Sequence, residues 1–239
     1  MDKINLLISG ANSDLAKPMI NRVLNMHQID HIHFLTHSEF NIKEDRVTVY
    51  KLDFSNSEEF ERISESLKLA NITHFIQYHG FAYKGDDLKS LNLQNLYKTL
   101  DINLISVVEI LKVLLPQMEK NKFGRIVLMS TASASYGGGL NGFSYGLAKH
   151  GIIYLTKHLA KYYTKQNILT NAVSPGFINS KFHTDVLGRS ETELQKRAEL
   201  VRLGRSGSAE DVNKVIYNLA FENDYISGEN IKIDGGDFI

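Results

Sequence analysis

A tyrosine and a lysine stand four residues apart in the stretch GFSYGLAKHGII, as Tyr145 and Lys149. On a helix, residues at this spacing lie on one face, so the phenol and the ammonium could point into one cleft. A phenol has an unperturbed pKa of about 10, and a fixed cation nearby lowers that pKa by stabilising the phenolate. The pair could therefore act as a general acid/base on an alcohol or a carbonyl group. Because the spacing is common, the pair alone also fits a half-buried tyrosine beside a surface lysine.

A candidate ligand-binding turn follows the apolar run of residues 4–8. That run predicts a strand buried on both faces, and a helix is expected to continue to about residue 26. A strand, a tight glycine turn and a helix N-terminus can bind a pyrophosphate on backbone N–H groups. Only Gly10 supplies a glycine, because Asp14 and Ala16 occupy positions where others would be expected. Ala16 still permits close packing, and Asp14 can cap the helix with its carboxylate turned away from the phosphate. An ordinary strand–helix turn is the alternative.

Strands and helices are expected to alternate along the chain. The sequence predicts strands at residues 4–8, 31–35, 47–52, 72–76, 125–129, 168–173 and 231–233, and later helices at about 57–69, 91–121, 143–165, 191–201 and 208–221. This alternation predicts an α/β fold, a single doubly wound Rossmann-type domain over residues 1–239 with a parallel sheet of about seven strands flanked by helices. Ligands of such sheets bind beyond the carboxyl ends of the strands. The strand-end residues Gly10, Thr36, Asp53 and Gly80 are therefore expected at the rim of the site.

The composition is that of an ordinary globular protein. Hydrophobic residues make up 43% of the 239-residue chain, and 27 Lys plus Arg balance 27 Asp plus Glu. This balance gives no support for binding nucleic acid or an anionic membrane. The chain has no cysteine, which excludes disulfides and thiol catalysis, and we expect no metal site. The N-terminal apolar run is too short for a signal peptide, and charges interrupt the apolar stretch 102–115, so we expect a soluble, cytoplasmic protein.

Eight short motifs occur in an order that resembles one known family. Along the chain they are SGANSDLA, LDF, QYHG, INL, GRIVLMSTAS, YGLAK, NAVSPGFINS and IDGG. Together they resemble the short-chain dehydrogenase/reductase family over essentially the whole chain, from its cofactor turn to its C-terminal Asp-Gly-Gly. Each motif is short, but their common order makes the spacing of Tyr145 and Lys149 specific.

The resemblance implies a role for each matching residue. Tyr145 would be the general acid/base, and Lys149 would lower its pKa and bind the nicotinamide ribose. Asn103 would hold a proton-relay water, and a hydroxyl at the end of the fifth strand would orient the substrate oxygen. Counting along the strand favours Thr131 for this hydroxyl, because a strand register slips less easily than a loop length. Counting back from Tyr145 allows Ser133 instead.

The resemblance also implies an NAD(P) cofactor. The positions that would hold it are Gly10, Asn12, Ser13, Asp14, Leu15, Thr36, His37, Asp53, Phe54, His79, Gly80, Tyr145, Lys149, Pro175, Gly176, Ile178 and Ser180. NAD-preferring members carry an acid at the end of the second strand, where it binds the ribose 2′-OH. Thr36 stands near that place and is followed by His37, a weak donor, so NADP is favoured over NAD. The sequence Gln77-Tyr78-His79 replaces the family's Asn-Asn-Ala and makes the wall near the adenine ribose bulkier.

We therefore expect an oxidoreductase that moves hydride between NAD(P) and a carbonyl or alcohol substrate, which the sequence does not name. The alternative is a dinucleotide-binding regulatory or scaffold protein without turnover, which the unusual cofactor turn favours. The polar segment 179–203 is predicted to be a lid over the site, or else an ordinary surface helix. With this segment, the loop 135–143 would set the specificity.

The helix predicted over residues 91–121 has apolar residues around more than one stripe. They are Leu100, Leu104, Val107, Val108, Leu111, Leu114 and Leu115. One stripe suffices to cover a sheet, so we expect the surplus to be buried in a homo-oligomer, a dimer or a tetramer. The resemblance implies that this helix and the Tyr145 helix form one interface, with residues 235–239 near a second. The alternative is that these residues fill the core of this chain.

Overall fold

The strands form one sheet in which every neighbouring pair runs parallel. The computed structural model describes residues 3–237 and, for Val186, the backbone alone. The seven strands have the order β3-β2-β1-β4-β5-β6-β7. Their bounds are β1 Ile4–Ser9, β2 Ile29–Thr36, β3 Val47–Lys51, β4 His74–Gln77, β5 Gly124–Met129, β6 Ile168–Pro175 and β7 Asn230–Ile233. The predicted doubly wound parallel sheet is confirmed.

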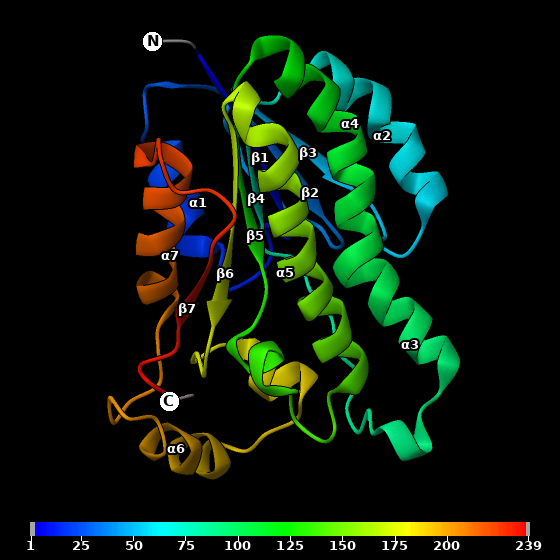
Figure 1. The fold of residues 1–239 in the computed structure, drawn as a ribbon, viewed down its shortest axis with the longest axis vertical. Helices are drawn as coiled ribbons and strands as arrows, with labels where there is room; N and C mark the ends of the chain where they lie inside the picture. The colour runs from blue at the N-terminus through cyan, green and yellow to red at the C-terminus, as the bar shows by residue number, and fades with distance from the viewer. Residues whose placement is uncertain (1–2, 238–239) are drawn as a thin grey trace.

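Helices cover both faces of this sheet (Figure 1). Their bounds are α1 Lys17–Leu24, α2 Ser57–Leu69, α3 Leu93–Leu100, α4 Ser106–Asn121, α5 Phe143–Tyr163, α6 Glu191–Glu199 and α7 Ala209–Tyr217. In Figure 1, α1 and α7 lie on one side of the sheet, whereas α2, α4 and α5 lie on the other. The short helix α6 lies beyond the carboxyl ends of the strands, at the end of the molecule where the ligand rim was predicted.

Successive strand residues supply a separate core on each face. Leu6 and Ile8 of β1 belong to the core that includes Met19 of α1, while Leu7 belongs to the core that includes Leu111 of α4. All of these side chains are fully buried or nearly so. Because neighbouring residues of a strand point to opposite faces, a sheet covered on both sides needs a continuous apolar run such as this one.

The stretch predicted as one helix over residues 91–121 is interrupted. Between α3 and α4 lies a π-helical turn, η2 (Asp101–Ile105). There Asn103 Nδ2 donates to the carbonyl oxygens of Thr99 and Phe81, each 2.8 Å away. Asparagine competes with the backbone for such bonds, and the wider turn accommodates them inside a stretch that is helical from Leu93 to Asn121.

A capping box stands at the start of the last helix, α7. The Ser208 hydroxyl accepts a hydrogen bond from the backbone N–H of Asp211, and the Asp211 carboxylate accepts one from the N–H of Ser208. The helix α7 ends at Tyr217, and the remainder of the predicted helix is a π-helical turn, η6 (Asn218–Glu222). The other predicted elements differ from the structure only at their ends.

The apolar residues expected to be surplus on the long helix are largely used within this chain. Val107, Leu111 and Leu114 are buried, and Leu104 and Leu115 pack against the same core. They therefore give no evidence of a partner by themselves. The exposed large apolar side chains on η2, α3 and α5 include Tyr97, Ile105, Leu147, Tyr154 and Tyr162. In the region predicted near a second interface, residues 238 and 239 lie outside the described residues.

Among residues 3–237, none of the helices combines the length and the apolar character that a membrane crossing requires.

Candidate active site

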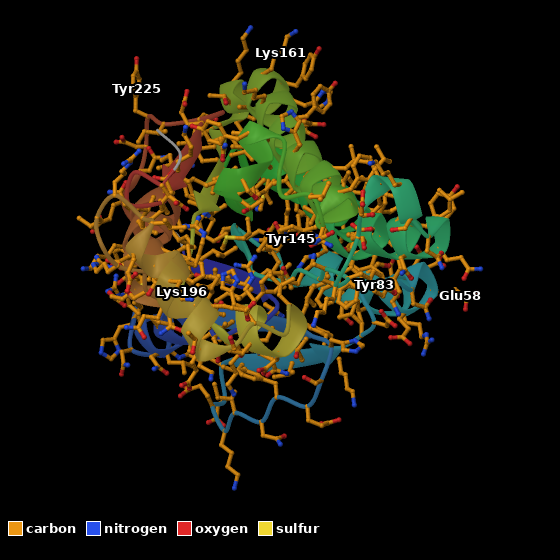
Figure 2. All side chains as sticks on the ribbon, turned by 90° about the horizontal axis from the view of Figure 1, so that it is seen from below. Glu58, Tyr83, Tyr145, Lys161, Lys196 and Tyr225 are labelled. Carbon is orange, nitrogen blue, oxygen red and sulfur yellow. The ribbon has the colours of Figure 1, made fainter. Side chains whose placement is uncertain are left out.

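A cavity of about 1180 Å³ opens at the carboxyl end of the sheet. Figure 2 looks onto this end of the molecule and shows Tyr145 near the middle, with Tyr83 on one side and Lys196 of α6 on the other. The β1–α1 turn, the segments that follow β2, β4, β5 and β6, and the first turns of α5 all contribute to the cavity wall. The topology therefore brings the predicted rim together in one place.

The structure places nearly all of the predicted site residues at this cavity. All of the residues predicted to hold the cofactor line it, and so do the predicted catalytic residues Thr131, Ser133, Tyr145 and Lys149. Asn103 does not contribute to the lining and is fully buried behind it.

Tyr145 and Lys149 lie on the face of α5 that borders the cavity. Lys149 is only 1% exposed, and its Nζ lies 5.6 Å from the centroid of the Tyr145 ring. The ammonium also donates a hydrogen bond to the carbonyl oxygen of Met129 at the end of β5, over 3.0 Å. The helical spacing thus brings the pair together as predicted, and β5 fixes the position of the cation.

Burial changes the proton affinity of both groups. It raises the pKa of Tyr145 above the usual range of a phenol, and it lowers the pKa of Lys149 to about 7. The prediction that the ammonium would lower the pKa of Tyr145 is therefore wrong. Removal of water disfavours the charged form of each side chain, so it raises the pKa of the phenol and lowers the pKa of the ammonium.

Two hydroxyl groups lie just beyond the end of β5. Thr131 Oγ1 and Ser133 Oγ are 3.2 Å apart, and both residues line the cavity. Ser133 belongs to the short 3₁₀ helix η3 (Ala132–Tyr136), which brings its hydroxyl back beside that of Thr131. The neighbouring Ser130 donates to the carbonyl oxygen of Lys149 instead, over 2.8 Å. Thr131 and Ser133 are joint candidates for the hydroxyl that orients a substrate.

The amide of Asn103 joins η2 to the segment after β4. Besides the two bonds that its Nδ2 donates, its Oδ1 accepts a hydrogen bond from the backbone N–H of Phe81, over 3.1 Å. A Cβ on Gly80 would lie 3.2 Å from Asn103 Oδ1 and 3.4 Å from Lys149 Nζ. The missing side chain at Gly80 thus lets the backbone pass close to both groups. The water-holding role of Asn103 stays a prediction.

The β1–α1 turn has the shape of an anion-binding turn. Gly10 has a φ of +79°, and a Cβ there would lie 2.3 Å from the backbone nitrogen of His79, so no side chain fits. Within residues 3–237, the backbone N–H groups of Asn12 and Asp14 have no hydrogen-bond acceptor. Backbone donors just before a helix can bind a pyrophosphate, so the residues present fit a dinucleotide cofactor.

The carboxylate of Asp14 links this turn to the predicted lid. It forms an ion pair with Lys17 over 2.6 Å and accepts a hydrogen bond from the backbone N–H of Lys181 over 3.3 Å. The hydrogen bond from Lys17 is the main reason why the pKa of Asp14 is lowered. The helix α1 begins after Ala16 without a side-chain cap, so the prediction that Asp14 caps it is wrong.

His79 forms part of the floor beneath the turn. Its Nδ1 lies 2.7 Å from Ser9 Oγ, its Nε2 lies 3.0 Å from Ser106 Oγ, and its ring stacks on Phe54 at 4.2 Å between centroids. Burial, with a smaller contribution from the charge of Lys149, lowers the pKa of His79 to about 3. The imidazole is therefore neutral at neutral pH, and both of its nitrogens are used within the protein.

The ends of β2 and β3 are fixed by local hydrogen bonds. Thr36 is fully buried, and its Oγ1 accepts a hydrogen bond from Asn12 Nδ2 over 2.9 Å. Asp53 Oδ1 accepts bonds from the N–H and the hydroxyl of Ser55, and these bonds help to lower the pKa of Asp53. His37 is exposed at the cavity mouth. The Asp53 carboxylate and the His37 imidazole are thus among the groups that this end of the cavity offers to a ligand.

The sequence analysis missed Asp86, a buried carboxylate that holds the start of α5. Its Oδ2 accepts a hydrogen bond from the Ser144 backbone N–H over 2.6 Å, and its Oδ1 accepts one from the Ser144 hydroxyl over 2.9 Å. A parallel bridge between Asp86 and Gly142 adds backbone contacts. The contact spans 58 positions in sequence, so no local motif could have indicated it.

The predicted lid segment borders the cavity beside Tyr145. Phe182, in the π-helical turn η5 (Phe182–Val186), has its ring centroid 5.7 Å from that of Tyr145. Farther along, Arg197 of α6 forms an ion pair with Asp237. The segment is therefore anchored at its far end to the C-terminal region.

Comparison with known proteins identifies the class. The family model described as enoyl-(acyl carrier protein) reductase matches residues 33–237. The chain belongs to the short-chain dehydrogenase/reductase family. It is 38% identical over 149 residues to 3-oxoacyl-(acyl-carrier-protein) reductase FabG of Aquifex aeolicus (strain VF5), an alignment that covers 62% of this chain and 58% of the relative.

Solved structures share the fold over nearly the full length. The structure of 4-hydroxyisoleucine dehydrogenase complexed with NADH is 26% identical, with a TM-score of 0.87 over 99% of both chains. The structure of ElxO with NADP bound is 25% identical, with a TM-score of 0.84 over 99% of both chains.

Proposed function

We propose that this protein is an NAD(P)-dependent oxidoreductase that transfers hydride between a nicotinamide cofactor and a carbonyl or alcohol substrate. The observation that carries the proposal is that Tyr145, Lys149 and the hydroxyl pair of Thr131 and Ser133 line the same cavity as the β1–α1 turn. Two relatives of the same fold support it, since one was solved with NADH and the other with NADP.

The residues divide the chemistry between them. A bound nicotinamide would supply or accept the hydride. Tyr145 would exchange a proton with the substrate oxygen, which Thr131 or Ser133 would orient. Because the pKa of Tyr145 is raised, the phenol is protonated at neutral pH and suits proton donation to a carbonyl oxygen. Lys149 would bind the ribose and stabilise the phenolate that forms when the proton leaves.

NADP is the cofactor we propose to be preferred. Thr36, His37 and Ser38 line the cavity at the end of β2, and none of them is an acid. A carboxylate at this place would bind the 2′-OH of NAD and repel the 2′-phosphate of NADP. The exposed imidazole of His37 offers a donor to that phosphate instead.

Consumption of NADPH and of NADH with a panel of ketones, aldehydes, keto-sugars and 3-oxoacyl thioesters tests the proposed function. We expect turnover of at least one class, faster with NADPH. Binding of cofactor without turnover of any carbonyl compound, or of any matching alcohol with the oxidised cofactor, would contradict it.

A dinucleotide-binding protein without turnover is the second candidate. One observation favours it, namely that burial raises the pKa of Tyr145 where an oxidising enzyme needs a phenolate. Fluorescence titration would then show cofactor binding that is equally tight in the wild type and in Tyr145→Phe, and neither protein would turn over.

We also propose that the protein is a homo-oligomer. The exposed residues Tyr154 and Tyr162 of α5 and Ile105 of η2 support this, because exposed apolar side chains on neighbouring helices suit a symmetric helix packing. Light scattering at micromolar concentration should give a multiple of the 27.0 kDa chain mass. We expect Tyr154→Arg to lower that mass, and a wild-type mass of one chain would contradict the proposal.

A further inference from the structure

Positive charge without a partner lines the cavity. Within residues 3–237, each carboxylate in the lining has a hydrogen-bond or ion-pair partner: Asp14 has Lys17, Asp53 has Ser55, Asp185 has Thr184, Glu193 has Ser190 and Asp237 has Arg197. Four cationic side chains of the same lining, those of Lys84, Lys98, Lys181 and Arg189, have no such partner in the described part of the chain.

Two of these cations lie beside the predicted cofactor residues. The charge of Lys98 contributes to the lowered pKa of Asp53, and the backbone of Lys181 contacts Asp14. Both are therefore placed to meet the dinucleotide. The cofactor does not explain why the remaining two cations, Lys84 and Arg189, line the cavity.

Lys84 and Arg189 come from different segments of the chain, and Lys84 lies against the backbone next to Arg189. Lys84 follows β4, whereas Arg189 follows the turn η5. A Cβ on Gly188, the residue before Arg189, would lie 3.0 Å from Lys84 Nζ. The ammonium thus lies against the backbone that leads into the guanidinium residue, and both side chains border the same part of the cavity.

This part is the substrate side of the cavity, which we define as residues 81–87, 137–142 and 182–189. The first of these ranges is joined to the start of the Tyr145 helix by Asp86, and the last brings Phe182 against the Tyr145 ring. Its apolar lining consists of Phe81, Ala82, Tyr83, Leu140, Phe182 and Leu187. A ligand with one end at Tyr145 would lie along these apolar walls. Its other end would lie beside the two cations.

Neighbouring groups do not cancel this charge. The acid that senses these two cations is Glu193, whose Oε2 is held at the start of α6 by the N–H and the hydroxyl of Ser190, at 2.7 and 2.8 Å. The charges of Arg189 and Lys84 both lower the pKa of Glu193, less than the bonds from Ser190 do. Burial is the main reason why the pKa of His183 is lowered to about 4, and the charges of Arg189 and Arg197 lower it further. This imidazole therefore adds no charge at neutral pH.

We propose that the substrate is an oxo acid: a carbonyl compound with an apolar body and a carboxylate at the end remote from the carbonyl group. Lys84 and Arg189 bind the carboxylate, for which the guanidinium provides a matching pair of donors. The inference rests on the proposed function, since it assumes that the carbonyl group is reduced beside Tyr145. Hydride comes from the reduced cofactor and a proton from Tyr145, so the product is the corresponding hydroxy acid.

Matched substrates test the charge alone. Each oxo acid of a chain-length series would be compared with its methyl ester, using kcat/KM with the reduced cofactor. We expect the wild type to prefer the acid by roughly tenfold or more, the scale of one hydrogen bond to a charged group. Lys84→Gln and Arg189→Gln should each raise KM for the acid several-fold and leave the ester unchanged, and the double variant should abolish the preference.

Lys196→Gln is the matched control, because Lys196 is exposed on α6 but does not line the cavity, and Figure 2 shows it apart from Tyr145. It removes the same charge and should preserve the preference. Competitive inhibition gives a second readout, using a carboxylate and its amide, neither of which can be reduced. In the double variant, the carboxylate should inhibit more weakly than in the wild type, and inhibition by the amide should not change.

The outcomes distinguish a failure of the oxo-acid inference from a failure of the proposed function. Equal turnover of acids and esters by the wild type, or a preference that the double variant retains, overturns the oxo-acid inference and leaves the proposed function standing. Absence of turnover for every acid and ester, with cofactor bound, removes the proposed function and the inference with it.

Discussion

The two sides of the cavity are built in different ways. On the cofactor side, formed by the β1–α1 turn and the ends of β2, β3 and β4, several polar side chains are buried and hydrogen-bonded. His79 is held between Ser9 and Ser106, and Thr36 accepts the Asn12 amide. On the substrate side, Lys84 and Arg189 are exposed and have no hydrogen-bond or ion-pair partner for their side chains among the described residues.

This difference follows from what each side is made of. The cofactor side consists largely of strand ends, whose positions the sheet already fixes. The substrate side consists of segments between elements, and glycines with positive φ such as Gly85, Gly138 and Gly188 turn the chain there. Segments of this kind can vary without disturbing the sheet, so they can set specificity while the cofactor side is kept.

The largest expected effect is at Tyr145, which borders both sides. Tyr145→Phe should lower kcat by more than ~100-fold, the scale of a lost general acid/base, and leave cofactor affinity unchanged. Tyr83→Phe removes a phenol hydroxyl from another residue of the cavity lining and serves as control, with near-normal kcat. Steady-state kinetics and fluorescence titration measure both, and near-normal turnover by Tyr145→Phe would remove the catalytic assignment.

His79, on the cofactor side, should contribute to a pH dependence of stability. The pKa of His79 is about 3 in the folded chain, below its ordinary value of 6.5, so the unfolded chain takes up the proton first. The stability gained from the neutral imidazole is complete above pH 6.5 and is lost as the pH falls toward 3, by up to about 1.4 kcal/mol per pH unit.

Denaturant unfolding of His79→Asn between about pH 7 and about pH 5 tests this, because the amide can replace Nδ1 beside Ser9 but does not titrate. The variant should lose stability less steeply with acid than the wild type. Some slope should persist, since burial also lowers the pKa of His74 to about 3. Identical slopes for the two proteins would show that His79 is not the group responsible.

The substrate side should prove to depend on one buried contact. Asp86→Ala removes the acceptor of both Ser144 bonds and should lower kcat by roughly tenfold, because the start of the Tyr145 helix is no longer fixed; its stability should fall by about 1 kcal/mol. In the Tyr145→Phe background, Asp86→Ala should have little further effect on turnover. A general loss of structure would instead lower turnover in the wild-type background and in the Tyr145→Phe background.

Asp211→Ala provides the control for Asp86→Ala. Asp211 takes part in a capping box at α7, where no predicted catalytic residue lies. The Asp211→Ala variant should lose about as much stability as Asp86→Ala but keep the kcat of the wild type. If both variants lose the same fraction of kcat, Asp86 acts through stability alone.

The smallest expected effect concerns cofactor choice. His37→Asp places a carboxylate beside the site of the 2′-phosphate and should weaken NADPH binding several-fold, while NADH binding is retained or improved. Titration of both reduced cofactors by fluorescence measures the ratio. Clearly tighter binding of NADH than of NADPH by the wild type would refute the proposed preference.

Sequence reasoning succeeded where strand register fixes a residue. Gly10, Asp53 and Gly80 follow strands, and parallel strands bring their carboxyl ends to one edge of the sheet, so their common cavity could be predicted. The choice between Thr131 and Ser133 could not be made, because η3 folds the two hydroxyls together.

It failed where a property depends on distant segments. The π-helical turn at Asn103 requires the carbonyl oxygen of Phe81, and the anchoring of Ser144 requires Asp86. The raised pKa of Tyr145 depends on how completely its surroundings, Phe182 among them, exclude water. None of these partners belongs to the motif that it affects.

The contact between Asp86 and Ser144 has a consequence for exchanging parts between relatives. Residues 81–87 and the segment leading into α5 form one hydrogen-bonded unit, through the Asp86 carboxylate and the bridge to Gly142. A graft of the first segment alone, made to import another substrate preference, would break the support of the proton donor. The two segments should therefore be transplanted together. A chimera that receives both segments should turn over substrate faster than a chimera that receives only one of them.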